Sequence, residues 1–110
     1  MEIYKNSIAI IGAGISGLAW GIILNKQNIK SVIFEKSSSV SEYGAGISIS
    51  KNGQYVLSEL DILDNIRIIS GNPQKAVFFS GSKKITSIES NVVTTSRKSL
   101  YDLLLNKYID

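Results

Sequence analysis

The chain has 110 residues, 44% of them hydrophobic and 19% charged, which predicts one folded domain with a small core rather than a disordered chain. Its net charge of +3 is spread along the sequence, and no basic run is interleaved with aromatic residues, so we expect no nucleic-acid partner. The absence of cysteine excludes disulfides and thiolate metal sites and favours the cytoplasm. The absence of histidine removes the commonest general base and leaves any chemistry to a bound cofactor.

A strand, a glycine-rich turn and a helix are predicted near the N-terminus. Residues 8–11 form a short apolar run typical of a buried parallel strand. The residues that follow have the GxGxxG spacing of a dinucleotide-binding turn: Gly12, Ala13, Gly14, Ile15, Ser16 and Gly17. In this motif the first glycine permits the tight turn, the second lets a pyrophosphate approach the backbone, and the third lets the helix pack closely. The helix N-terminus then attracts the phosphates, and Gly21 extends the close contact one turn further along the helix.

The second strand is predicted over residues 31–34 and ends in Glu35. An acid at this place accepts hydrogen bonds from an adenosine ribose and repels a 2′-phosphate, which favours FAD or NAD over NADP. Lys36 follows directly; it contacts a phosphate or is solvated, and the residues alone favour the solvated reading. A βαβ core over about residues 7–35 is therefore predicted.

A membrane span or signal peptide is the alternative reading of this segment. Residues 6–25 carry no charge and are long enough to span a bilayer. Four glycines dilute the segment, however, and the chain opens with Glu2 and Lys5 rather than with a basic stretch. We therefore expect a buried βαβ core and no membrane span.

The middle of the chain is predicted to continue with a polar loop, a strand and a helix. The loop covers residues 36–43, and a short half-buried strand covers residues 47–50. Ser50 is expected to cap a helix over residues 51–60. The apolar face of this helix is expected to consist of Val56, Leu57 and Leu60, prolonged by Leu63 and Ile66.

The last third is predicted to contain an antiparallel hairpin and a helix. After a break at residues 71–73, strands over residues 76–79 and 85–88 are joined through residues 80–84, where Lys83 and Lys84 read as a solvated turn. A short strand over residues 92–95 precedes Ser96, the expected N-cap of a helix over residues 97–109. The apolar stripe of this helix is expected to comprise Leu100, Leu103, Leu104 and Tyr108.

Arg97 is unusual because a cation in the first helical turn faces the positive end of the helix dipole, at a cost of about 0.3–1 kcal/mol. A bound anion beside it would reverse that sign. Taken without the glycine motif, the residue reads as a solvated surface arginine.

Together these motifs resemble those of the single-component FAD monooxygenases, the flavin-dependent aromatic hydroxylases related to salicylate and 4-hydroxybenzoate hydroxylases. Residues 10–18 are similar to the family's FAD fingerprint and residues 32–36 to its second strand with the ribose acid. The stretch from Gly44-Ala45-Gly46-Ile47 through Leu60-Asp61-Ile62-Leu63-Asp64 is similar to the family's GAGI…PN…LGLLD segment. Residues 96–104 resemble its HRxxLxxxL helix, whose arginine contacts FAD.

The resemblance implies that residues 1–110 are a partial FAD-binding domain of the α/β class, a Rossmann-like βαβ unit with an added antiparallel hairpin. It implies FAD as cofactor, NAD(P)H as co-substrate and an aromatic or similar small molecule as substrate. The implied cofactor contacts are residues 12–17 with Glu35, Lys36, Gly46 and Arg97, and no catalytic residue is implied.

The sequence also departs from the family. Lys51 replaces the usual proline and Ser96 the frequent histidine, and neither an Asp-Gly nor a Gly-Asp pair occurs. The family's substrate domain has no counterpart either, so the chain is expected to be a truncated part that is inactive alone. An NAD-dependent dehydrogenase fragment and a non-catalytic Rossmann-like module are the alternatives.

Overall fold

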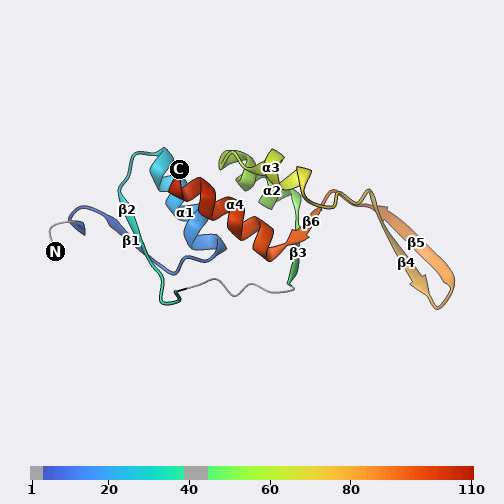
Figure 1. Cartoon of the computed structure of the whole chain (residues 1–110). Coiled ribbons are helices and arrows are strands. Elements are labelled where there is room, and N and C mark those ends of the chain that lie inside the picture. Colours follow the sequence, from blue (N-terminus) through green and yellow to red (C-terminus); the bar gives the residue numbers. More distant parts are fainter. Residues whose placement is uncertain (1–3, 39–44) are drawn as a thin grey trace.

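The computed structural model describes residues 4–38 and 45–110, and its first unit is a parallel βαβ motif (Figure 1). Strand β1 (Ile8–Ile11) pairs in parallel with β2 (Ser31–Phe34), with Ile10 opposite Ile33, and α1 (Ile15–Lys26) makes the crossover. A backbone hydrogen bond of 2.7 Å from the N–H of Gly12 to the carbonyl of Phe34 extends the pairing into the turn. The Rossmann-like α/β class predicted from the sequence is confirmed.

The apolar run of β1 is exposed, so the prediction of a buried strand was wrong. Ile8 and Ile11 are 47% and 82% exposed. In the described chain the sheet has two strands, and α1 covers the face that carries Ile10 and Ile33. Because alternate side chains of a strand point to opposite faces, Ile11 lies on the other face and remains exposed.

A second unit consists of a two-stranded sheet and two short helices. Strand β3 (Gly46–Ile49) pairs antiparallel with β6 (Val93–Ser96), which places Gly46 opposite Ser96. Helices α2 (Lys51–Glu59) and α3 (Leu63–Ile68) follow β3. Asp61 separates them with a φ of 62°, and the Lys26 ammonium of α1 lies 3.2 Å from its carboxylate. The apolar face expected to continue past residue 60 therefore belongs to two helices joined by a sharp turn.

Two details of α2 differ from the predictions. Leu57 and Leu60 are buried, but Val56 is 42% exposed and does not belong to the core. Ser50 occupies the N-cap position without a capping hydrogen bond from its side chain. Its hydroxyl instead bonds the side-chain oxygen of Asn52, which also accepts the N–H of Gly53 at 3.0 Å. The side chain of Asn52 therefore accepts the helix N-terminal N–H that Ser50 is predicted to accept.

The predicted hairpin forms a ribbon that projects from the rest of the molecule (Figure 1). The whole molecule is 65 Å long. Its strands are β4 (Lys75–Ser80) and β5 (Lys83–Glu89), paired antiparallel. The strands are longer than predicted because a two-residue turn, Gly81 and Ser82, replaces the expected five-residue connection. Gly81 has a φ of 59°, a conformation that the first central residue of such a turn requires.

The core lies where α4 (Arg97–Ile109) packs on α1 and on the second unit. Leu18, Leu60, Ile66, Val93 and Leu104 are its most deeply buried residues. Leu100 is also buried, and Leu103 and Tyr108 pack against the core, as the stripe on the last helix predicts. The close contact at Gly21 is made mainly with α4, since a Cβ on Gly21 would lie 2.5 Å from the Tyr108 ring and 3.1 Å from Ile33.

Candidate functional site

The glycine turn between β1 and α1 is the base of the site. Gly12 has a φ of 99°, which side-chain-bearing residues rarely adopt. A Cβ on Gly17 would lie 2.0 Å from the carbonyl oxygen of Gly12, so α1 rests directly on the turn that precedes it. A Cβ on Gly14 would meet nothing within 4 Å. The first and third glycines therefore shape the turn, and the second leaves open space beside the backbone.

Glu35 connects the end of β2 to this turn. Its carboxylate accepts the N–H of Ala13 at 3.0 Å through Oε1 and the N–H of Ser37 at 3.1 Å through Oε2. Both hydrogen bonds lower the pKa of the Glu35 carboxyl from its usual 4.5, and the one from Ala13 has the larger effect. Each carboxylate oxygen has a second lone pair, so the group can also accept hydrogen bonds from a ligand. The sequence did not reveal this bracing of the turn by Glu35.

A hollow of about 450 Å³ lies beside the turn and the start of α1. Its lining comprises Ile11, Gly12, Gly14, Ile15, Ser16, Gly17 and Arg97. Six of these residues come from the first 17 positions, and Arg97 joins them from the far end of the chain. The structure therefore brings the two separate motifs of the sequence into one cavity.

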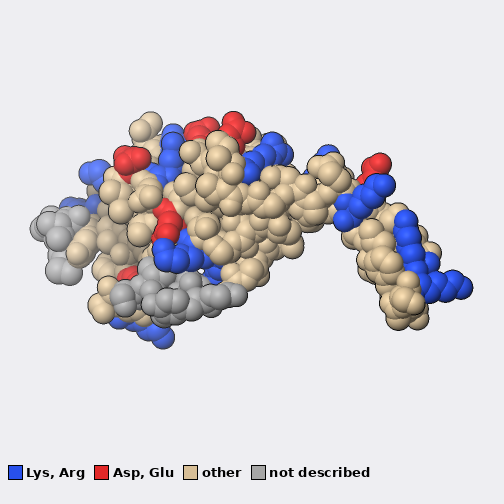
Figure 2. Space-filling view, turned by 45° about the vertical axis from the view of Figure 1, so that its right-hand side comes forward, with Lys and Arg blue, Asp and Glu red and all other residues tan. Residues whose placement is uncertain are grey.

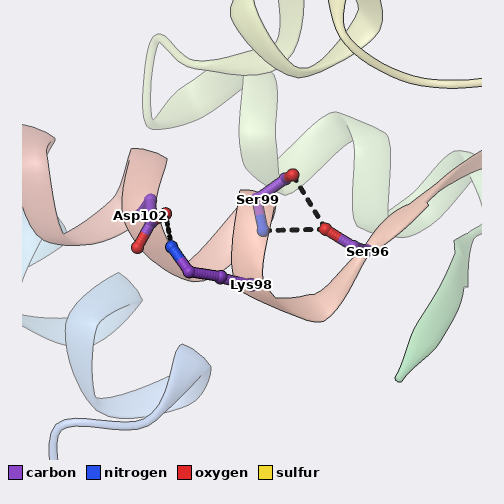
Figure 3. A network of polar contacts seen from close by, with 4 residues as sticks. All are labelled: Ser96, Lys98, Ser99 and Asp102. Carbon is purple, nitrogen blue, oxygen red and sulfur yellow. Dashed lines mark hydrogen bonds and ion pairs between the residues drawn. The ribbon is translucent and has the colours of Figure 1, made fainter. Parts of the chain in front are cut away.

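Arg97 is held there by the start of α4. The hydroxyl of Ser96 accepts the N–H of Ser99 at 3.0 Å and donates to the Ser99 hydroxyl at 2.8 Å, which confirms Ser96 as the N-cap (Figure 3). The backbone N–H of Arg97 donates to the carbonyl of Ala45 at 2.9 Å. Lys98, its neighbour, pairs with Asp102 at 2.6 Å on the same helix (Figure 3). The Ser96 cap and the hydrogen bond to Ala45 together fix the backbone of Arg97.

A second hollow, of about 520 Å³, adjoins the first, because Ile11 and Gly12 line both. Phe34, Glu35 and Lys36 complete its lining. The ring of Tyr4 meets that of Phe34 edge to face at a centroid distance of 5.6 Å. Ile11 and Phe34 thus give this hollow an apolar wall beside the Glu35 carboxylate. The sequence missed their part in the site because an apolar strand residue reads as core.

The remaining predicted site residues take different places. Ala13 contributes its N–H to Glu35, as described above. Gly46 lies outside both linings, but it pairs with Ser96 and so sits beside the residue that precedes Arg97. Gly44 and most of the predicted loop over residues 36–43 lie outside the described residues. Two hollows meet at the glycine turn, one lined by Arg97 and the other by Glu35 and Lys36, and together they can accommodate an elongated ligand with an anionic centre.

Comparison with known proteins shows what the chain is similar to. Residues 10–59 match the model of the NAD(P)-binding Rossmann-like domain. Monooxygenase 1 from Arabidopsis thaliana is 38% identical over 92 residues, covering 82% of this chain and 23% of that protein. The FAD-dependent monooxygenase pytG from Aspergillus terreus is 43% identical over 61 residues, 56% of this chain and 18% of the relative. Over most of its length the chain is therefore similar to the N-terminal part of FAD-dependent monooxygenases.

Aromatic hydroxylases are among its homologues. For 3-hydroxybenzoate 6-hydroxylase 1 from Aquipseudomonas alcaligenes the identity is 33% over 85 residues, 76% of this chain and 22% of the relative. Among solved structures, the tetrameric form of 2-methyl-3-hydroxypyridine-5-carboxylic acid oxygenase superposes with a TM-score of 0.83 at 31% identity. That match covers 96% of this chain and 29% of the oxygenase. The chain thus spans about a quarter of the length of the proteins it matches.

Two further features are absent from the described residues. Within residues 4–38 and 45–110, no helix combines the length and the apolar character needed to cross a membrane. The same ranges contain no cluster of three or more acidic, histidine or cysteine side chains suited to a metal ion.

Proposed function

We propose that residues 1–110 form the FAD-binding part of an NAD(P)H-consuming monooxygenase that hydroxylates a small aromatic molecule. The observation that carries this proposal is the meeting of Arg97 with the glycine turn in one hollow, next to the Glu35 hollow. FAD fits this pair of hollows by its chemistry, since it has a pyrophosphate between an adenosine and a flavin. The relatives support the cofactor and the aromatic substrate, since pytG is an FAD-dependent monooxygenase and 3-hydroxybenzoate 6-hydroxylase 1 acts on an aromatic acid.

Each residue of the site has a distinct part in the proposal. The open space at Gly14 admits the pyrophosphate, and the N–H groups at the start of α1 bind its oxygens. Arg97, which lines the same hollow, neutralises its charge. Gly46 pairs with the neighbouring Ser96, and Lys36 lines the adjoining hollow. Glu35 accepts hydrogen bonds from the ribose hydroxyls through its remaining lone pairs. The bound flavin supplies the redox chemistry of oxygen transfer, and no described residue is assigned a catalytic role.

The alternative of an NAD-dependent dehydrogenase shares the glycine turn and the ribose acid. The presence of Arg97 in the phosphate hollow and the identity of the relatives favour FAD instead. A cytoplasmic location is part of the proposal, because a sequence without cysteine suits a reducing compartment.

The test compares two substitutions that remove the same charge from adjacent positions. Arg97→Gln removes the cation that lines the hollow, whereas Lys98→Gln removes one that is paired with Asp102. We expect Arg97→Gln to weaken FAD binding in calorimetric titration about tenfold to hundredfold, the value of a charge-assisted hydrogen bond of about 1.5–3 kcal/mol. Lys98→Gln should leave the affinity within about twofold of the parent. Equal effects of both substitutions would remove Arg97 from the cofactor site.

A further inference from the structure

The glycine turn is held at three points, and one of them depends on a side chain. The N–H of Gly12 donates to the carbonyl of Phe34 at 2.7 Å, and the carbonyl of Gly12 lies against Gly17. Both of these contacts are made by backbone atoms. The N–H of Ala13, in contrast, donates to Oε1 of Glu35 at 3.0 Å. The conformation of the residue between the first two glycines therefore depends on the carboxylate that follows β2.

Glu35 is itself fixed in the orientation that this contact requires. Its second oxygen, Oε2, accepts the N–H of Ser37 at 3.1 Å, so the carboxylate is attached to backbone through both of its oxygens. The lowered pKa of the Glu35 carboxyl keeps the group ionised at neutral pH, the state in which both oxygens accept. Glu35 lines one hollow and Ala13 belongs to the turn that lines the other. Their hydrogen bond therefore connects the two hollows.

This hydrogen bond also determines which N–H groups of the turn are left for an anion. Because Ala13 donates to the carboxylate, phosphate oxygens must be bound by donors further along the chain, at the start of α1. The N–H of Leu18 donates to the carbonyl of Gly14 at 2.9 Å, so in α1 the N–H groups just before Leu18 precede the hydrogen-bond ladder of the helix. The residues that carry them line the hollow that also contains Arg97: Ile15, Ser16 and Gly17. The direction of these donors depends on how the turn leads into the helix.

We propose that Glu35 is a positioning residue for the phosphate part of the site: through the N–H of Ala13 it holds the glycine turn in the conformation that directs the start of α1 at the pyrophosphate. This inference rests on the proposed function, in which Glu35 accepts hydrogen bonds from the ribose, and it adds a second role that needs no ribose. Because both roles use one carboxylate, binding of the ribose in one hollow is coupled to binding of the phosphates in the other.

A ligand without ribose hydroxyls separates the two roles. Dideoxy-ADP, which lacks both ribose hydroxyls, keeps the adenine and the pyrophosphate of ADP. If Glu35 acts only on the ribose, Glu35→Ala leaves the affinity for this ligand unchanged, or raises it because a negative charge near the phosphates is removed. If Glu35 positions the turn, the same substitution lowers the affinity against that electrostatic effect. The sign of the change therefore distinguishes the two cases.

Calorimetric titration of the chain at neutral pH measures the affinities for ADP and dideoxy-ADP. We expect Glu35→Ala to weaken the binding of dideoxy-ADP about fivefold and that of ADP by a larger factor, since only ADP also loses its ribose contacts. Glu35→Gln keeps an oxygen that accepts the N–H of Ala13, and it should restore dideoxy-ADP binding to within about twofold of the parent.

Glu89→Ala is the matched control for the loss of a negative charge. Figure 2 shows acidic side chains on the ribbon as well as on the body of the molecule, and Glu89 is the last residue of β5. Because the ribbon projects away from the glycine turn (Figure 1), the control should leave both affinities within about twofold of the parent.

Amide hydrogen exchange tests the same contact without a ligand. In Glu35→Ala the N–H of Ala13 should exchange about fivefold faster than in the parent, because it has lost its acceptor. The N–H of Leu18, which donates within the backbone, should keep its rate. A general loss of stability would accelerate both amides, so the comparison separates a positioning role from a merely structural one.

The inference is overturned if Glu35→Ala leaves the affinity for dideoxy-ADP unchanged or raises it, if Glu35→Gln loses as much as Glu35→Ala, or if the exchange of the Ala13 amide does not change. A parent chain that binds ADP but not dideoxy-ADP would also overturn it, because the turn would then not hold phosphates without the ribose. A parent chain that binds neither ligand would contradict the proposed function itself, and this inference with it.

Discussion

Gly17→Ala is the substitution that most sharply tests how the glycine turn is built. The new Cβ would lie 2.0 Å from the Gly12 carbonyl oxygen, whereas a carbon and an oxygen in close contact normally lie about 3.3 Å apart. The start of α1 and the turn must therefore separate by about 1.3 Å. The obstacle is backbone, so no side-chain rotation relieves it. Overpacking of this kind costs about 1–3 kcal/mol, and the higher helix propensity of alanine offsets at most about 1 kcal/mol.

We expect a net loss of about 1–2 kcal/mol, which lowers the melting temperature of a domain of this size by about 5–10 °C. Urea denaturation followed by the fluorescence of Trp20 measures this loss, since it is the single tryptophan and lies on α1. FAD binding should be lost at the same time because the turn is displaced.

Gly14→Ala is the matched control for this prediction. Its Cβ would meet nothing within 4 Å, and the backbone at Gly14, with φ −79° and ψ −173°, accommodates alanine. We expect the stability to change by less than about 0.5 kcal/mol while FAD affinity falls, because the added methyl group occupies the space beside the phosphates. If Gly17→Ala unfolds at the same urea concentration as the parent, or if Gly14→Ala is equally destabilised, the reasoning is refuted.

Three further predictions address the acid, the cap and the helix contact. Glu35→Gln should lower the free energy of unfolding at neutral pH, because the lowered pKa of the Glu35 carboxyl stabilises the fold while the group is ionised. The difference in stability between parent and variant should shrink as the pH falls below 4.5, which paired urea titrations across this range measure. Ser96→Ala removes the capping acceptor and should cost about 1 kcal/mol in thermal unfolding, whereas Ser99→Ala retains the backbone N–H that donates and should cost less. Gly21→Ala forces the Tyr108 ring, 2.5 Å from the new Cβ, to move and should cost about 1–3 kcal/mol; Tyr108→Ala in the same chain should restore the helix contact, measured as a double-mutant cycle.

Much of the fold was readable from local sequence signals. The strand–turn–helix–strand order, the break before the hairpin and the cap at Ser96 follow from periodicity, glycine positions and side-chain chemistry within a few residues. These are short-range effects, so a single sequence contains them. The parallel pairing of β1 with β2 follows from the same signals, because a helical crossover between strands imposes it.

What could not be read depends on contacts between distant residues. The apolar run of β1 has the composition of a buried strand, yet burial is decided by how many layers pack on the sheet. Val56 fits the apolar helix face, yet it is 42% exposed, because burial depends on which other elements pack on that face. Glu35 is predicted as a site residue from its place after β2 and lines the second hollow, while its hydrogen bond to Ala13 spans 22 positions and has no local signature. The hollow shared by Arg97 and the glycine turn emerged from the family resemblance and the structure together.

The most direct test of the central claim is a calorimetric titration of the chain with FAD, ADP, FMN and NADP under one set of conditions. If the glycine turn, Glu35 and Arg97 hold the adenosine and pyrophosphate of FAD, then FAD and ADP bind, NADP binds more weakly because its 2′-phosphate meets the Glu35 carboxylate, and FMN, which lacks adenosine, binds most weakly. Tighter binding of FMN than of FAD would contradict the account.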